Sequence, residues 1–154
     1  LTQRFSAEFS IRPFIERYPE KSLKLLRKWS RHASPHVRRL VSEGSRPRLP
    51  WGMRLRVFSN APEKTLALLE LLKDDPELYV RRSVANHLGD LLKDHPELVY
   101  ETCRSWIAEV SARKIPRETR SARFWMIRHA VRLPAKKNNP EALEIRRLAK
   151  SGSR

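Results

Sequence analysis

The chain has 154 residues, of which 33 are Lys or Arg and 17 are Asp or Glu, so its formal net charge is +16. This charge favours a polyanionic partner, with nucleic acid ahead of an anionic membrane surface. The single cysteine, Cys103, excludes an intramolecular disulfide and a cysteine-based zinc site, and His36, His95 and His129 are not spaced as metal ligands. No apolar run approaches the roughly 20 residues that cross a bilayer, and nothing resembles a signal peptide. We therefore expect a soluble, cytosolic protein.

Helices joined by proline-marked turns account for most of the chain, because glycine is scarce and strand-like alternation is absent. The clearest apolar helix faces occur at residues 23–29, 66–72 and 80–91. Residues 113–123 are basic and lack apolar periodicity, so this segment is predicted to be a surface loop.

A similar pattern recurs along the chain at a regular spacing. Val37-Arg38-Arg39 and Val80-Arg81-Arg82 are 43 residues apart, and a weaker copy that begins at Met126 follows 46 residues later. Helical repeats of about 40–47 residues indicate paired-helix units of the HEAT type. We expect an all-α, HEAT-like helical repeat solenoid (an α-α superhelix) that lacks some N-terminal repeats. Residues 1–150 would form this domain and residues 151–154 a frayed tail.

One helix of this pattern is interrupted in a way that stacking alone does not require. The helix that begins at Pro35 reaches Glu43 and then meets Gly44 and Pro47, so it is predicted to end just after Glu43. Glu43 is thereby placed beside a rigid basic loop, RPRLPW at residues 46–51. In the second copy the position of Glu43 is taken by Asn86, and that helix continues through Asp90.

These segments resemble the AlkC-type DNA alkylation repair glycosylases, which belong with the AlkD type to the HEAT-like repeat DNA glycosylases. The resemblance runs in order over nearly the whole chain and rests on residues 5–14 (FSAEFSIRPF), 34–51, 79–96, 125–130 (WMIRHA) and 136–143 (KKNNPEAL). It implies a monofunctional glycosylase of base excision repair that excises N-alkylated bases from duplex DNA. It also implies that Asp90, Glu43 and Glu8 are the catalytic carboxylates and that Trp51 contacts the lesion.

The chemistry of these residues is compatible with that role. Cleavage of an N-glycosidic bond builds positive charge on the sugar, which one carboxylate stabilises while the same or another positions water. An alkylated base is already cationic and leaves without a strong general acid, so neither a metal nor another cofactor is expected. Trp51 would stack on the exposed base or fill the gap in the duplex, and such stacking is worth about 1–3 kcal/mol.

The abundant arginines divide into two expected groups. Arg38 and Arg81 are expected to be structural, because a Val-Arg pair at the start of the second helix is a common element of HEAT-like repeats. The expected contacts to the DNA backbone are Arg39, Arg82, Arg46, Arg48, Arg54 and Arg128. Phosphate contacts fix the register on a duplex without reading its sequence, which suits an enzyme that scans any DNA.

Several alternatives stay open at this point. Glu43 could be a solvated helix-end acid, Asp90 could face solvent, Glu8 could lie in a segment that only packs the core, and Trp51 could anchor its loop. The chain could be a non-catalytic HEAT-repeat nucleic-acid binder or a protein-interaction scaffold. The expected partner is double-stranded DNA with alkylated bases, bound by a monomer. The preferred base, 3-methyladenine, 3-methylcytosine or a bulkier adduct, is left open, as is lyase activity. Two further questions are open: which arginine of each Val-Arg-Arg pair is structural, and whether missing N-terminal repeats abolish activity.

Overall fold

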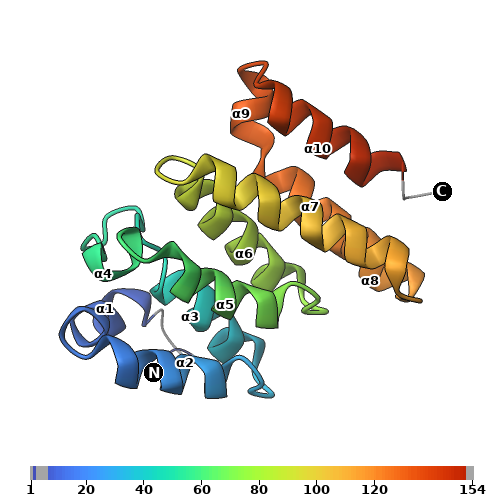
Figure 1. Cartoon of the computed structure of the whole chain (residues 1–154). Helices are drawn as coiled ribbons and strands as arrows, with labels where there is room; N and C mark the ends of the chain where they lie inside the picture. The colour runs from blue at the N-terminus through green and yellow to red at the C-terminus, as the bar shows by residue number, and fades with distance from the viewer. Residues whose placement is uncertain (1, 3–6, 152–154) are drawn as a thin grey trace.

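In the computed structural model, which describes Thr2 and residues 7–151, every regular element of the described chain is an α-helix (Figure 1). The helices are α1 (Glu8–Arg17), α2 (Pro19–Trp29), α3 (Pro35–Gly44), α4 (Arg56–Ser59), α5 (Pro62–Leu72), α6 (Leu78–Leu91), α7 (Pro96–Ala112), α8 (Arg117–Ala130), α9 (Arg132–Lys136) and α10 (Pro140–Ser151). Half of them begin at a proline, because proline lacks the N–H that the first helical turn leaves unbonded. The predicted all-α class is confirmed.

The helices pack in two rows, as a paired-helix solenoid requires. We call α1, α3, α6 and α8 the inner row, in which each helix packs against the next, and α2, α5 and α7 the outer row (Figure 1). Helix α10 packs against α7 and α8 at the end of the stack opposite α1. One continuous apolar core lies between the rows and includes Leu26, Leu69, Leu88, Trp106 and Phe124.

The repeat relation between the two Val-Arg-Arg segments is confirmed by identical backbone contacts. Arg38 Nη1 donates hydrogen bonds to the carbonyls of His32 and Ala33, at 2.9 and 2.7 Å. Arg81 Nη1 donates to the carbonyls of Asp75 and Pro76, at 2.8 and 2.6 Å. In both copies the acceptors lie six and five residues before the arginine. Arg38 and Arg81 are therefore structural, as predicted, and each holds the turn that precedes its helix.

The structure corrects the loop predicted at residues 113–123. Only residues 113–116 connect two helices, because α8 already begins at Arg117. Arg123 is buried on α8, where it forms ion pairs with Asp74 and Glu109 and donates a hydrogen bond to the Trp106 carbonyl at 3.0 Å. Ion pairs between the buried Arg123 and two partly exposed carboxylates therefore help to hold this part of α8, where the sequence shows no apolar periodicity.

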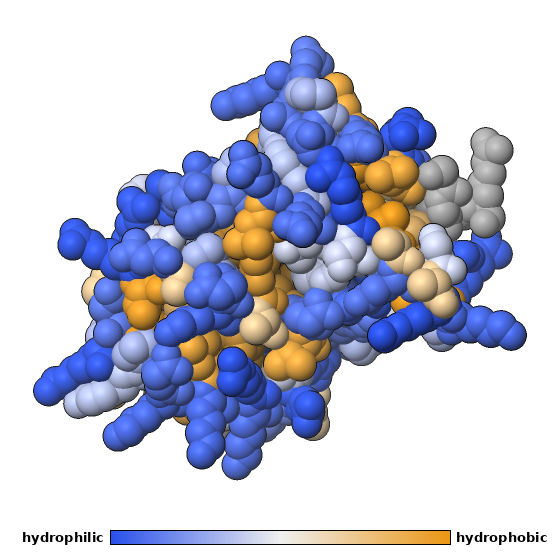
Figure 2. All heavy atoms as spheres, viewed as in Figure 1, coloured by the Kyte–Doolittle hydropathy of each residue, from blue (hydrophilic) through white to orange (hydrophobic). Residues whose placement is uncertain are grey.

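The surface is largely polar, with bands of apolar atoms between the polar side chains (Figure 2). Four large apolar or aromatic side chains are exposed at one end of the stack, on α1, on α2 and at the residue between them: Phe9, Phe14, Tyr18 and Leu25. No helix in the described part of the chain has the length and apolar character of a membrane span. Residues 152–154 of the predicted tail lie outside the described residues.

Candidate functional site

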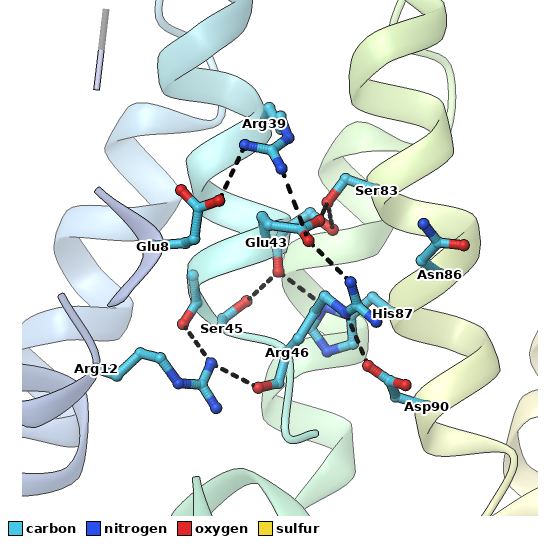
Figure 3. Close-up of polar contacts among 12 residues, drawn as sticks. Glu8, Arg12, Arg39, Glu43, Ser45, Arg46, Ser83, Asn86, His87 and Asp90 are labelled. Atoms are coloured by element: carbon cyan, nitrogen blue, oxygen red, sulfur yellow. Dashed lines mark hydrogen bonds and ion pairs between the residues drawn. The ribbon is translucent and has the colours of Figure 1, made fainter. Parts of the chain in front are cut away.

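The fold brings the three predicted catalytic carboxylates to one place on the inner row (Figure 3). Glu8 is the first residue of α1, Glu43 lies in the last turn of α3 and Asp90 in the last turn of α6. All three are buried, with exposed fractions of 6%, 7% and 5%. Burial of a charged carboxylate is costly unless it is paired and hydrogen-bonded, so the partners of these groups define the site. The alternatives of a solvated Glu43 and a solvent-facing Asp90 do not fit this burial.

Two arginines alternate with the carboxylates and link them into one ladder (Figure 3). The Arg39 guanidinium lies between Glu8 and Glu43, with N···O distances of 3.5 and 3.7 Å. The Arg46 guanidinium lies between Glu43 and Asp90, at 2.8 and 2.7 Å. We call these five side chains the carboxylate cluster. Lys93, whose side chain is about half exposed, also pairs with Asp90, with Nζ 3.4 Å from Oδ1. The three carboxylates therefore face two guanidinium groups inside the cluster and one ammonium group at its edge.

Ser83 is a member of the site that the sequence analysis missed. Its hydroxyl donates a hydrogen bond to Glu43 Oε2 at 2.5 Å and lies 3.0 Å from the Ser42 hydroxyl, which can donate to it in turn. Both oxygens of Glu43 are therefore held, one by Arg46 and one by Ser83. The repeat offered a signal for Ser83, because this polar residue occupies the position that the buried Leu40 has in the first copy.

His87 lies under the cluster and is completely buried on α6. Its Nδ1 lies 3.1 Å from the Ser42 carbonyl and acts as the donor, while Nε2 has no hydrogen-bond partner among the described residues. Burial lowers the pKa of His87 to about 3, and the nearby Arg46 and Arg12 also lower it. The ring is therefore neutral at physiological pH.

The buried neutral state of His87 predicts an acid-sensitive fold. The folded state resists protonation of a ring that the unfolded chain protonates near pH 6.5, so this stabilisation is complete above pH 6.5 and is lost towards pH 3. Between pH 6.5 and 5 we expect the wild type to lose about 2 kcal/mol more unfolding free energy than His87→Asn. Urea denaturation at each pH measures it. His36 is exposed, so His36→Asn should lose unfolding free energy with falling pH as the wild type does. An equal loss in all three proteins would contradict the prediction.

The loop between α3 and α4 presents Trp51 to solvent. Trp51 is 99% exposed and has a φ of 62°, a left-handed conformation that is unusual for a large side chain. Leu49 and Leu55 are buried on either side of it, and the Gly52 N–H donates to the Leu49 carbonyl at 3.0 Å. These leucines anchor the loop, so the alternative in which Trp51 is the anchor is not supported. The indole is free to meet a ligand.

The arginines predicted to contact the DNA backbone lie in different settings. Arg46 is buried and held by two carboxylates, so we reassign it from a phosphate contact to the carboxylate cluster. Arg128 is half-buried and donates to the Ala149 carbonyl. Arg82 is exposed on α6.

Two further predicted backbone contacts, Arg48 and Arg54, share one acid at the rim of the loop. Both pair with Asp94, at 2.5 and 3.7 Å, and the hydrogen bond from Arg48 is the main cause that lowers the pKa of Asp94. Arg39 also lies over the Tyr79 ring, with its guanidinium carbon 4.8 Å from the ring centroid. Phosphate contacts by Arg39, Arg48, Arg54, Arg82 and Arg128 stay predictions.

No group of three or more His, Cys, Asp or Glu side chains suited to a metal ion occurs in the part of the chain that the structure describes.

Comparisons with known proteins place this site in a wider context. No family model matches the chain. The chain is 42% identical over 144 residues to the uncharacterized protein YhaZ of Bacillus subtilis strain 168, across 94% of the chain and 38% of that protein. It is 43% identical to the alkylpurine DNA glycosylase AlkC of Pseudomonas fluorescens, whose structure was solved bound to DNA containing an abasic site analog. That match has a TM-score of 0.83 and again covers 94% of the chain and 38% of the solved chain.

Proposed function

Because the chain is of the AlkC type in sequence and in its helical repeat fold, we propose that it carries the active site of a DNA glycosylase for N-alkylated bases. The observation that carries the proposal is the carboxylate cluster, in which three helices of the inner row bring three buried carboxylates together, and the loop that follows the second of these helices carries an exposed tryptophan. The chain spans about 38% of the length of the two proteins it matches, so the activity is proposed for the site and not inferred from the whole relatives.

The charge balance of the cluster suits the proposed reaction. Hydrolysis of the N-glycosidic bond passes through a sugar with cationic character, and the carboxylates of the cluster would stabilise it. Asp90 stabilises this cation and Glu43 orients the attacking water, with Glu8 adding negative charge at the far end of the ladder. The base of an alkylated nucleotide carries its own positive charge and leaves as a neutral molecule, so the site needs no strong general acid.

The two arginines of the cluster make this concentration of carboxylates possible. Three neighbouring buried carboxylates without cations would favour protonation, which removes the negative charge that the reaction uses. Arg46 contributes a guanidinium that binds Glu43 and Asp90 at once, in a geometry suited to carboxylates. Arg46 therefore holds both groups in position before the substrate arrives.

Duplex DNA is the proposed partner, bound by a monomer. The net charge of +16 supports a strong, salt-dependent attraction to phosphates. Arg48 and Arg54 flank Trp51 in the loop, so phosphate contacts there would seat the indole against the damaged nucleotide. The ion pair with Asp94 keeps both arginines near the loop surface in the free protein.

Release of free base from methylated duplex DNA tests this function. We expect the 154-residue chain to release 3-methyladenine, 3-methylcytosine or both, identified by chromatography, and to leave alkali-sensitive abasic sites in the DNA. Unmethylated duplex of the same sequence is the control and should release nothing. Salt-dependent DNA binding without release at saturating protein would support the non-catalytic binder instead. The absence of both binding and release would support a protein-interaction scaffold.

A further inference from the structure

Arg12 is a fully buried arginine with no place in the chemistry described so far. It lies on α1, one turn after Glu8, and its side chain is 0% exposed. Burial is the main cause that lowers its pKa to about 10, and Arg46 lowers it further, so the guanidinium is still charged at neutral pH. A buried cation is costly, and its contacts therefore indicate what it stabilises.

The hydrogen bonds that Arg12 donates within the described structure all go to backbone carbonyls at the two ends of one loop. Nη1 donates to the carbonyls of Gly44 and Arg46 at 3.1 and 2.8 Å, where the loop leaves α3. Nε donates to the Met53 carbonyl at 2.7 Å, and Nη2 donates to the same oxygen, where the loop returns. One planar group thus clamps residues 44–53 into a closed turn. We call this segment the Trp51 loop.

The Trp51 loop carries two side chains of the proposed reaction, which face opposite ways. The Arg46 side chain turns inward to Glu43 and Asp90, while its carbonyl is held by Arg12. Trp51, two residues before Met53, stands fully in solvent with a positive φ. A large residue keeps such a backbone conformation only where its surroundings impose it. The Arg12 guanidinium is packed against this turn, since a Cβ built on Gly52 would lie 3.3 Å from Arg12 Nε.

We propose that Arg12 is a positioning residue that sets the place of Trp51 and of Arg46 relative to Glu8 on its own helix. This inference rests on the function proposed above. Among the described residues, the hydrogen bonds of Arg12 go to backbone carbonyls of the Trp51 loop, while its charge interacts with Glu43 and Asp90 at longer range. Arg12→Lys keeps that charge, so this variant reports the effect of Arg12 on the Trp51 loop. Lysine cannot replace it, because a single ammonium group lacks the planar fork that reaches three carbonyls on two sides of the loop.

Tryptic cleavage of the loop tests the clamp independently of any activity. The bonds after Arg48 and Arg54 are trypsin sites inside or next to the Trp51 loop, and the bond after Lys114 is an exposed site far along the chain. In Arg12→Lys we expect cleavage after Arg48 and Arg54 to become about tenfold faster, with cleavage after Lys114 unchanged. Equal acceleration at all three sites would indicate general unfolding and would overturn the proposal, as would no change at any of them.

A double-mutant cycle with Trp51→Ala tests the link to the reaction. Arg12→Lys is expected to slow single-turnover base release about 10–100-fold in the wild-type background, as expected for a misplaced group. In the Trp51→Ala background this effect should become smaller, because one of the two residues that Arg12 positions is gone and only the effect through Arg46 remains. Independent, multiplicative effects of the two changes would overturn the positioning role.

A second variant, Gly52→Ala, disturbs the contact between Arg12 and the Trp51 loop by changing the loop and not α1. Gly52→Ala places a methyl group 3.3 Å from Arg12 Nε and 3.1 Å from a Leu49 methyl, and it should give the same pattern of faster cleavage after Arg48 and Arg54. Failure of this variant to loosen the loop, together with wild-type cleavage of Arg12→Lys, would remove the clamp. If the wild type releases no base, the proposed function fails, while the cleavage experiments still decide the clamp.

Discussion

Replacement of Asp90 by asparagine is expected to slow base release from methylated duplex DNA by at least about 100-fold, with DNA binding retained. Asparagine keeps the shape and an acceptor oxygen for Arg46, and it removes only the negative charge that would face the sugar cation. The cluster then has two carboxylates instead of three beside the same cations, so less negative charge is available to a cationic sugar. Base release in a single turnover at saturating enzyme measures the rate of the chemical step. A filter-binding or anisotropy assay measures binding to the same DNA separately.

The matched control for Asp90→Asn is Glu101→Gln, which also converts a carboxylate to an amide. Glu101 is exposed on α7 in the outer row, away from the cluster. This variant should release base at the wild-type rate, so that a general effect of net charge is excluded. An Asp90→Asn protein that binds DNA and releases base as fast as the control would remove Asp90 from the chemistry.

Replacement of Arg46 by methionine is expected to cause the largest loss of stability, about 3–5 kcal/mol of unfolding free energy at neutral pH. The substitution leaves Glu43 and Asp90 buried at 7% and 5% exposure without the cation that bonds to both. Methionine has a similar length, so the effect reports the lost charge more than a cavity. Urea denaturation followed by circular dichroism measures it.

Arg48→Met is the control for Arg46→Met. Arg48 comes from the same loop and, like Arg46, pairs with an aspartate; its partner is Asp94, which lies just after α6. Its ion pair is partly exposed, so the expected loss of unfolding free energy is at most about 1 kcal/mol. The double variant Arg46→Met, Asp90→Asn should regain part of the stability lost in Arg46→Met, since one unpaired buried charge is gone. Equal losses for Arg46→Met and Arg48→Met would show that the cluster is not the stabilised unit that we describe.

Asp90 and Arg46 belong to one cluster that bears on both the proposed reaction and the stability of the fold. A site that gathers carboxylates for a cationic transition state raises their mutual repulsion, and the fold offsets this with arginines that point inward. Part of the basic composition therefore pairs with buried carboxylates or holds turns, and is not available for the proposed contacts to DNA. Arg12, Arg38 and Arg81 hold backbone carbonyls, and Arg46 holds carboxylates. Net charge alone overstates the number of phosphate contacts.

The sequence by itself determined the helical repeat and the residues at its most unusual point. Prolines at helix starts and apolar spacing are local signals, so the helices and the end of α3 at Gly44, just after Glu43, followed from them. The 43-residue offset correctly identified Arg38 and Arg81 as equivalent and structural. The sequence also predicted that α3 ends just after Glu43. The structure shows that the loop after this helix end carries the exposed Trp51.

Only the tertiary structure decided what each polar side chain meets. Arg46 and Asp90 are 44 residues apart, Arg12 and Met53 are 41 apart, and both contacts arise from the stacking of neighbouring repeats. A sequence read for periodicity assigns a basic loop residue to the solvent, because exposure is the usual state of arginine. Burial of Arg46, Arg12 and Arg123 departs from that rule. Their acceptors come from other helices and loops, and packing alone brings those acceptors within hydrogen-bonding distance.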